Sequence, residues 1–140
     1  MISLVMDTSN SYLAVGLFQD NMCLEAFQEK GSRRQSEKAI PTLKEVLDRH
    51  HIALKDVNEM IITSGPGSYT GVRVAMTIAK TLAAVSDVRI KSVSSLAAYA
   101  GMSQALSVID ARGHKVFVGV YENGLPLIKE QVVALEDFAQ

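Results

Sequence analysis

One pattern occurs twice in the sequence, about a hundred residues apart, at residues 5–21 and 108–124. In each copy an apolar pair leads into an aspartate, Asp7 in the first and Asp110 in the second. A glycine follows nine residues later, and an apolar-polar-acidic stretch closes both copies. A fold for this chain must therefore accommodate the same strand-turn-strand unit twice.

Length, charge and cysteine content exclude several classes of protein. The chain has 140 residues, nearly half of them apolar, which is enough for about one domain with a sizeable core. Its net charge is −1 and no more than two Lys or Arg residues are adjacent, so it is not expected to grip nucleic acid by itself. Cys23 is the only cysteine, and neither a signal peptide nor a membrane span is recognisable. We expect a soluble cytoplasmic protein.

The hydrophobic periods predict alternating strands and helices. Apolar stretches at 2–6, 12–18 and 23–29 predict a three-stranded antiparallel meander, and Ile40, Leu43, Val46 and Leu47 predict an amphipathic helix over 36–50 with Pro41 inside it. A strand at 57–63, a helix at 72–85, a strand at 89–93, a helix at 94–102 capped by Ser94 or Ser95, and three strands within 105–134 are predicted to follow.

The helix predicted at 72–85 is apolar around most of its circumference. Its polar residues Arg73, Thr77, Lys80 and Thr81 occupy an arc of only about 100°. Apolar residues cover about 200° of the remainder, although a helix that lies on one sheet needs only about 100°. We therefore expect a second buried face, which either another helix of this chain or a partner chain would cover.

The stretch SGPGSYTGVR, residues 64–73, forms a glycine loop between a predicted buried strand and a helix. Such a place suits an anion, because backbone N–H groups and the helix dipole point outward there. The spacing matches neither a Walker A loop, nor the dinucleotide fingerprint, nor a nucleophile elbow. A tight connection whose glycines supply positive φ is the alternative, and the sequence leaves both open.

The turns that follow Asp7 and Asp110 invite the same two interpretations. Each aspartate ends an apolar strand, at the edge where open α/β sheets bind ligands, but each could equally cap its turn through an Asx hydrogen bond. The residues of these candidate nucleotide or anion loops are Asp7, Thr8, Ser9, Gly65, Gly67, Ser68, Thr70, Gly71, Arg73 and Asp110.

No metal site is expected, because the histidines do not show the spacing of a ligand set. His50 and His51 end the first predicted helix, where a cation meets the negative end of the helix dipole. His114 lies in the turn of the second repeat, and Cys23 begins a strand as a small apolar residue.

Together these features resemble a known family. A βββαβα lobe with an Asp-Thr-Ser turn, restarted about a hundred residues later, is similar to the duplicated actin, sugar-kinase and Hsp70 (ASKHA) fold. The elements SGPGSYTGVR, VSSL and VIDARGHKVFVGVY resemble the TsaB (YeaZ) family from Met1 to about Gly124. The resemblance implies an α/β, ribonuclease H-like lobe at 1–103 with a mixed five-stranded sheet and flanking helices. A three-stranded start of a second lobe, apparently incomplete, is then expected at 104–140.

The family resemblance implies a non-catalytic subunit. TsaB-like proteins pair with a catalytic TsaD subunit that makes N6-threonylcarbamoyladenosine at position 37 of tRNA, and a TsaE-like ATPase completes the system. Pairing, with TsaD or with a second copy, uses the first-lobe helices. The implied interface residues are Ile40, Leu43, Leu47, Val74, Ala75, Ile78 and Leu82.

The resemblance also implies that the chain binds no cofactor by itself, that ATP or ADP could lie only at the interface with partner subunits, and that tRNA is reached only through the complex. No ATP hydrolysis by the chain alone is expected. Two other hypotheses remain. The chain could be an enzyme in its own right, either a small-molecule phosphotransferase of the same superfamily or a glycoprotease-like peptidase, or it could be a homodimeric module.

Overall fold

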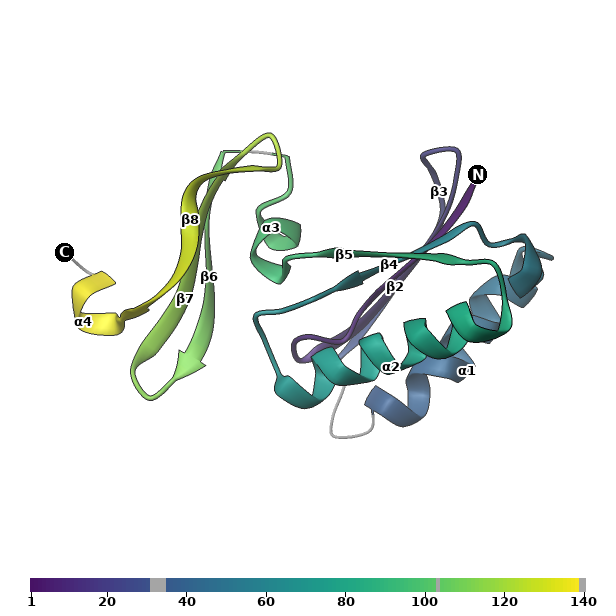
Figure 1. Cartoon of the computed structure of the whole chain (residues 1–140), viewed down its shortest axis with the longest axis horizontal. Coiled ribbons are helices and arrows are strands. Elements are labelled where there is room, and N and C mark those ends of the chain that lie inside the picture. Colours follow the sequence, from purple (N-terminus) through teal and green to yellow (C-terminus); the bar gives the residue numbers. More distant parts are fainter. Residues whose placement is uncertain (31–34, 103, 139–140) are drawn as a thin grey trace.

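The computed structural model describes residues 1–30, 35–102 and 104–138. They form two sheets with helices, shown in Figure 1. The elements in chain order are β1 (Ile2–Asp7), β2 (Tyr12–Gln19), β3 (Met22–Lys30), α1 (Gln35–Arg49), the 3₁₀ helix η1 (Leu54–Asp56), β4 (Glu59–Thr63), α2 (Tyr69–Val85), β5 (Arg89–Val93), α3 (Ser95–Ala100), β6 (Ala105–Arg112), β7 (Lys115–Glu122), β8 (Leu125–Ala134) and α4 (Leu135–Phe138).

The first sheet has five strands in the order β3-β2-β1-β4-β5. The meander β1-β2-β3 is antiparallel, whereas β4 and β5 join it in parallel, so the predicted mixed sheet is confirmed. Alternate residues of the central strands, such as Leu4, Met6 and Ile62, are at most 1% exposed. They face α1 and α2, which both lie on the same side of the sheet (Figure 1).

The second sheet has three antiparallel strands, β6-β7-β8. Helix α3 packs on this second sheet. Leu96 and Ala100 of α3 form a small hydrophobic core with Ile109 of β6 and Tyr121 of β7. Figure 1 shows α3 between the two sheets. The predicted boundary between residues 103 and 104 adjoins residue 103, which lies outside the described residues.

The two copies of the repeated pattern share one packing detail. A Cβ atom on Gly16 would lie 2.9 Å from the ring of Phe18, and a Cβ on Gly119 would lie 2.6 Å from the ring of Tyr121. In both copies, therefore, the glycine leaves room for the aromatic side chain two residues further along the strand. The repeat is thus a repeat of packing as well as of sequence.

The two aspartates of the repeat also make the same hydrogen bond. The Oδ1 atom of Asp7 accepts from the backbone N–H of Ser9 at 2.8 Å, and that of Asp110 accepts from the N–H of Arg112 at 2.8 Å. These are the Asx turns that formed one of the two interpretations of the sequence.

The strand pairing differs between the copies by one residue. Val5 pairs with Gly16 in the first copy, but Ser107 pairs with Gly119 in the second, where an exact repeat would have used Val108. The pairing of β6 with β7 is also irregular between Asp110 and Arg112. Because side chains alternate along a strand, a shift of one residue moves the glycine to the opposite face of its sheet.

Several boundaries differ from the predictions. Helix α2 begins at Tyr69 instead of 72, because Ser68 caps it, and β4 begins at Glu59 instead of 57, because the unpredicted η1 precedes it. Helix α3 ends at Ala100, where Gly101 has a φ of +65°. No helix in the described part of the chain is long and apolar enough to cross a membrane.

Candidate functional site

One oxygen of the Asp7 carboxylate accepts hydrogen bonds from three donors of the chain itself. Its Oδ1 atom accepts from the backbone N–H of Ser9 at 2.8 Å and from the Ser9 hydroxyl at 2.6 Å. The Thr63 hydroxyl, from the end of the neighbouring strand β4, donates to the same atom at 2.6 Å. The aspartate therefore ties the ends of β1 and β4 together at the carboxyl edge of the sheet.

Thr8 and Ser9, which complete the turn, are 0% and 1% exposed. The Thr8 hydroxyl donates to the carbonyl of Gly71 at 2.5 Å, and the Ser9 carbonyl accepts from the N–H of Ser68 at 2.7 Å. The Ser95 hydroxyl donates to the hydroxyl of Ser9 at 3.0 Å. The polar groups of this turn are thus satisfied by the glycine loop and by α3.

The glycine loop packs directly onto this turn. A Cβ atom on Gly67 would lie 2.2 Å from the Ser9 carbonyl oxygen, and one on Gly71 would lie 1.9 Å from the Thr8 carbonyl oxygen. Only glycine allows such an approach. Gly65 has a φ of +99°, and Ser68 caps α2 by accepting from the N–H of Gly71 at 3.2 Å.

These contacts give Gly65, Gly67 and Gly71 a structural role, in line with the interpretation of this loop as a tight connection. Two carbonyl oxygens, which repel anions, occupy the space beside Gly67 and Gly71. The anion-binding interpretation stays a prediction, and the exposed polar side chains of residues 64–73 are those of Ser64, Ser68, Tyr69, Thr70 and Arg73. Among the described contacts, the carboxylate of Asp110 meets only its own turn in the second sheet.

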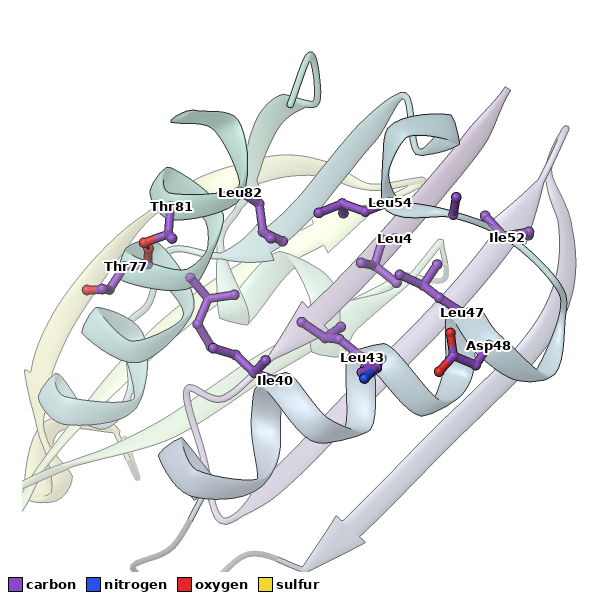
Figure 2. A pocket seen from close by; sticks show the side chains of 13 residues that line it. Leu4, Ile40, Leu43, Leu47, Asp48, Ile52, Leu54, Thr77, Thr81 and Leu82 are labelled. Atoms are coloured by element: carbon purple, nitrogen blue, oxygen red, sulfur yellow. Dashed lines mark hydrogen bonds between the residues drawn. The ribbon is translucent and has the colours of Figure 1, made fainter. Parts of the chain in front are cut away.

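A groove lies between α1 and α2, with a volume of about 380 Å³. Figure 2 shows the side chains of Ile40, Leu43 and Leu82 converging on it, with Thr77 and Thr81 on the α2 side. Its lining residues are Leu4, Ile40, Leu43, Lys44, Leu47, Asp48, Ile52, Ala53, Leu54, Thr77, Ile78, Thr81 and Leu82. The two helices therefore leave apolar surface between them that no other part of the described residues covers.

A second hollow of about 370 Å³ adjoins the groove near the first turns of α2. The two share Ile40, Thr77 and Ile78, and the second is also lined by Tyr69, Thr70, Arg73 and Val74. We call the two hollows together the α1–α2 surface.

The predicted interface residues divide into three groups. Ile40 is 59% exposed, and Val74 and Leu82 are half-buried, so these three are accessible. Leu43, Leu47 and Ile78 are 5–7% exposed and belong to the chain's own core, but they form part of the groove floor. The assignment of Ala75 is corrected: it is 0% exposed and packs within the first-lobe core.

His50, which follows the last residue of α1, contacts a carboxylate of the first sheet. The Nε2 atom of His50 lies 2.9 Å from Oε1 of Glu25 on β3, and Arg49 forms an ion pair with the same carboxylate. The Arg49 guanidinium is the main reason why the pKa of Glu25 lies below its usual range, with His50 adding to the effect. The described residues contain no group of three His, Cys, Asp or Glu side chains that could hold a metal ion.

A cluster of polar side chains around Glu130 was not predicted from the sequence. The hydroxyls of Ser94 and Tyr121 both donate to the carboxylate Oε1 of this β8 residue. Burial raises the pKa of Tyr121, and the hydrogen bond to Glu130 raises it further. Ser94 and Ser95 thus bind opposite lobes, Ser94 to Glu130 in the second and Ser95 to Ser9 in the first. Only the two adjacent serines at a predicted helix start could have pointed to this arrangement.

Comparison with known proteins agrees with this architecture. A family model described as TsaD, tRNA N6-adenosine threonylcarbamoyltransferase, matches residues 28–139. A protein of Bacillus subtilis named tRNA threonylcarbamoyladenosine biosynthesis protein TsaB is 33% identical across 100% of this chain, and an Escherichia coli protein of the same name is 31% identical across 87% of it. The chain belongs to the TsaB family.

A solved structure of this family has the same fold. YeaZ from Pseudomonas aeruginosa is similar, with a TM-score of 0.85 and 29% identity over 94% of this chain and 67% of that one. Thermus thermophilus RuvC, at 13% identity and a TM-score of 0.51, shares the ribonuclease H-like fold alone. The chain spans 65% of the length of the Bacillus TsaB and 57% of that of the Escherichia TsaB.

Proposed function

We propose that this chain is a non-catalytic subunit that pairs with a TsaD-type transferase in the formation of N6-threonylcarbamoyladenosine at position 37 of tRNA. Membership of the TsaB family supports the proposal, and one structural observation carries it. The groove between α1 and α2 presents the exposed Ile40 and the half-buried Leu82 beside a floor of core leucines, and the described residues leave it open. An apolar groove between helices is a common site for a partner helix.

The geometry of the β1 turn supports the non-catalytic role. A phosphotransferase of the ASKHA superfamily would need a carboxylate base and an open cradle for phosphate. Here Asp7 accepts three hydrogen bonds from the chain, and the carbonyl oxygens of Thr8 and Ser9 fill the space beside Gly71 and Gly67. We therefore propose that the chain binds no nucleotide alone and that ATP or ADP could lie only where partner subunits meet.

A peptidase would need an activated nucleophile, and the buried serines of this site are not arranged as one. Ser9 donates to Asp7, and Ser95 donates to Ser9. In the described part of the chain, neither serine forms a hydrogen bond with a histidine, the usual base for a serine nucleophile. This geometry favours a scaffold over the peptidase alternative.

The other partners follow from the same proposal. With a net charge of −1, the chain itself would add little to tRNA binding, so the transferase would hold the tRNA. A TsaE-like ATPase would join the assembly, and the complex would act in the cytoplasm. The α1–α2 surface could also pair with a second copy, which light scattering on the purified chain would detect.

The test is the affinity of the chain for the TsaD-type protein of the same organism, measured by titration calorimetry. Ile40→Glu places a charge on the exposed edge of the groove without disturbing the core, and it should abolish pairing while thermal unfolding stays unchanged. Leu127→Glu is the matched control, because Leu127 on β8 has a similar exposure, 54% against 59% for Ile40, but lies in the second sheet. Normal pairing by the Ile40 variant would contradict the proposed interface.

Hydrolysis of ATP by the chain alone provides a separate check. The proposal expects none above background. Turnover that Asp7→Asn abolishes would instead favour the phosphotransferase.

A further inference from the structure

Helix α2 carries a net positive charge. It contains two cations, Arg73 and Lys80, and no acidic residue, whereas the whole chain has a net charge of −1. Helix α1, on the other side of the groove, is balanced, with three acidic and three basic residues. Arg73 and Lys80 are seven residues apart, about two helical turns, so they lie on the same face of α2. That face is basic.

Arg73 is held in place without a carboxylate partner. Its guanidinium lies over the ring of Tyr69, 5.3 Å from the ring centre, and its Nη1 donates to the Tyr69 hydroxyl at 3.1 Å. Within the described residues, no ion pair joins Arg73 to an acidic side chain. A guanidinium fixed in this way still has N–H groups free for a planar carboxylate, which it can bind through two parallel hydrogen bonds.

The surroundings of Arg73 would strengthen such a bond. Arg73 lines the same hollow as Ile40, Val74 and Ile78, at the end of α2 where the apolar groove begins. A helix laid along the groove would cover this apolar floor and exclude water from the guanidinium. In a drier setting an ion pair is screened less, and an unpaired charge becomes costly.

We propose that the α1–α2 surface takes an acidic amphipathic helix of the TsaD-type partner, whose apolar side chains enter the groove and whose carboxylate binds Arg73. The inference rests on the proposed function and goes further by stating the chemistry of the partner's contacting helix. Apolar residues at helical spacing would contact Ile40 and Leu82, and an Asp or Glu would lie at the Arg73 end. Arg73 is then a specificity-determining residue of the pairing.

The same charges disfavour a second copy as the occupant. If two α2 helices packed against each other about a twofold axis, Arg73 and Lys80 of both copies would come together with no acidic residue from either α2. Like charges in an interface oppose association and select against the wrong partner. An acidic partner removes this repulsion, so the chain should prefer the transferase to itself.

The experiment measures the affinity of the chain for the TsaD-type partner by titration calorimetry at two salt concentrations. Arg73→Glu should weaken pairing at least tenfold at low salt without lowering the thermal unfolding midpoint, because the side chain is exposed. Arg73→Lys should recover part of the affinity, since an ammonium keeps the charge but not the planar fork. Lys115→Glu makes the same charge reversal on β7 of the second sheet and should stay within twofold of wild type.

A charge swap identifies the partner residue. Each Asp and Glu of the partner's contacting helix is replaced by Arg in turn, and one replacement should restore the affinity lost in Arg73→Glu. If Arg73→Glu pairs as tightly as wild type while Ile40→Glu does not pair, the groove is the interface but the acidic helix is wrong. If the wild-type chain does not pair at all, the proposed function fails and this inference fails with it. Tighter binding to a second copy than to the partner would also overturn the inference.

Discussion

A Cβ atom on Gly71 would lie 1.9 Å from the carbonyl oxygen of Thr8. The first turn of α2 and the turn after β1 are therefore in direct backbone contact, and the Thr8 hydroxyl returns a hydrogen bond of 2.5 Å to the Gly71 carbonyl. This contact sets where α2 begins on the sheet. Because α2 forms one side of the α1–α2 surface, the contact also fixes the proposed interface.

The first prediction concerns Gly71→Ala. In most helices this change stabilises the protein by about 1 kcal/mol, because alanine is the better helix former. Here the added methyl group would meet backbone, which cannot move aside like a flexible side chain, so we expect a loss of about 3 kcal/mol. Urea denaturation measures the difference. Thr70→Ala, at the exposed neighbouring position, is the control and should change stability by less than about 0.5 kcal/mol.

The second prediction separates the hydrogen bond of this contact from its packing. Thr8→Val keeps the shape of the side chain but removes the donor to the Gly71 carbonyl, inside a site where Thr8 is 0% exposed. The variant should lose about 1–3 kcal/mol, the usual cost of an unsatisfied buried group. Thr8→Ser keeps the hydroxyl and should lose less. A larger loss in urea denaturation for Thr8→Ser than for Thr8→Val would show that the methyl group, not the hydrogen bond, matters.

The order of the elements could be predicted because the local hydrophobic period indicates strands and helices. The mixed five-stranded sheet was expected from the family resemblance. The interface residues on α2 were harder to predict. An apolar arc of about 200° indicates two buried faces but not which residues belong to which face. Ala75 lies on the side facing the chain's own core, whereas Val74, one residue earlier, lines the hollow beside the groove. Which residues of α2 face the core depends on the orientation of the helix about its own axis on the sheet. Long-range contacts such as that of Thr8 with Gly71 determine this orientation.

Local sequence patterns also could not predict the details of the second lobe. The sequence repeat predicts two similar hairpins. In the second hairpin, however, the register between β6 and β7 is shifted by one residue relative to the first hairpin, and the pairing is irregular between Asp110 and Arg112. A bulge leaves no regular signal in a hydrophobic pattern. The contacts of Glu130 could not be predicted from local sequence either, because only the fold brings this β8 residue to Ser94 and Tyr121.

The third prediction compares the two glycines of the repeat. Gly119→Ala should lose about 1–3 kcal/mol, since the new methyl group would meet the ring of Tyr121, which is 2% exposed and held by its hydrogen bond to Glu130. Gly16→Ala should lose less, because the Phe18 ring is only half-buried and can shift. Thermal unfolding of the two variants gives the comparison. A larger loss at Gly16 would contradict the role assigned to the Tyr121 hydrogen bond.

The last prediction is a pH dependence that comes from Glu59 on β4. This residue is 4% exposed, its Oε2 lies 2.9 Å from the Lys91 ammonium, and its Oε1 accepts from the Ser3 hydroxyl at 2.7 Å. Lys91 first, and then Ser3, hold the pKa of the carboxyl below its usual range. A carboxyl whose pKa is lower in the folded state binds its proton more tightly when the chain is unfolded, so it stabilises the fold above the unfolded pKa, about 4.3. That contribution is lost as the pH falls through the lower, folded-state pKa.

Glu59→Gln should therefore lose about 1–2 kcal/mol at pH 7, and the difference from wild type should shrink as the pH falls below about 4.3. Urea denaturation across pH 3–7 measures both free energies of unfolding. Glu122→Gln removes an exposed carboxylate at the end of β7 and serves as the control, with little expected change at any pH in this range. A constant difference between Glu59→Gln and wild type from pH 7 to pH 3 would mean that Glu59 stabilises the sheet by its packing and hydrogen bond alone, and that its charge contributes nothing.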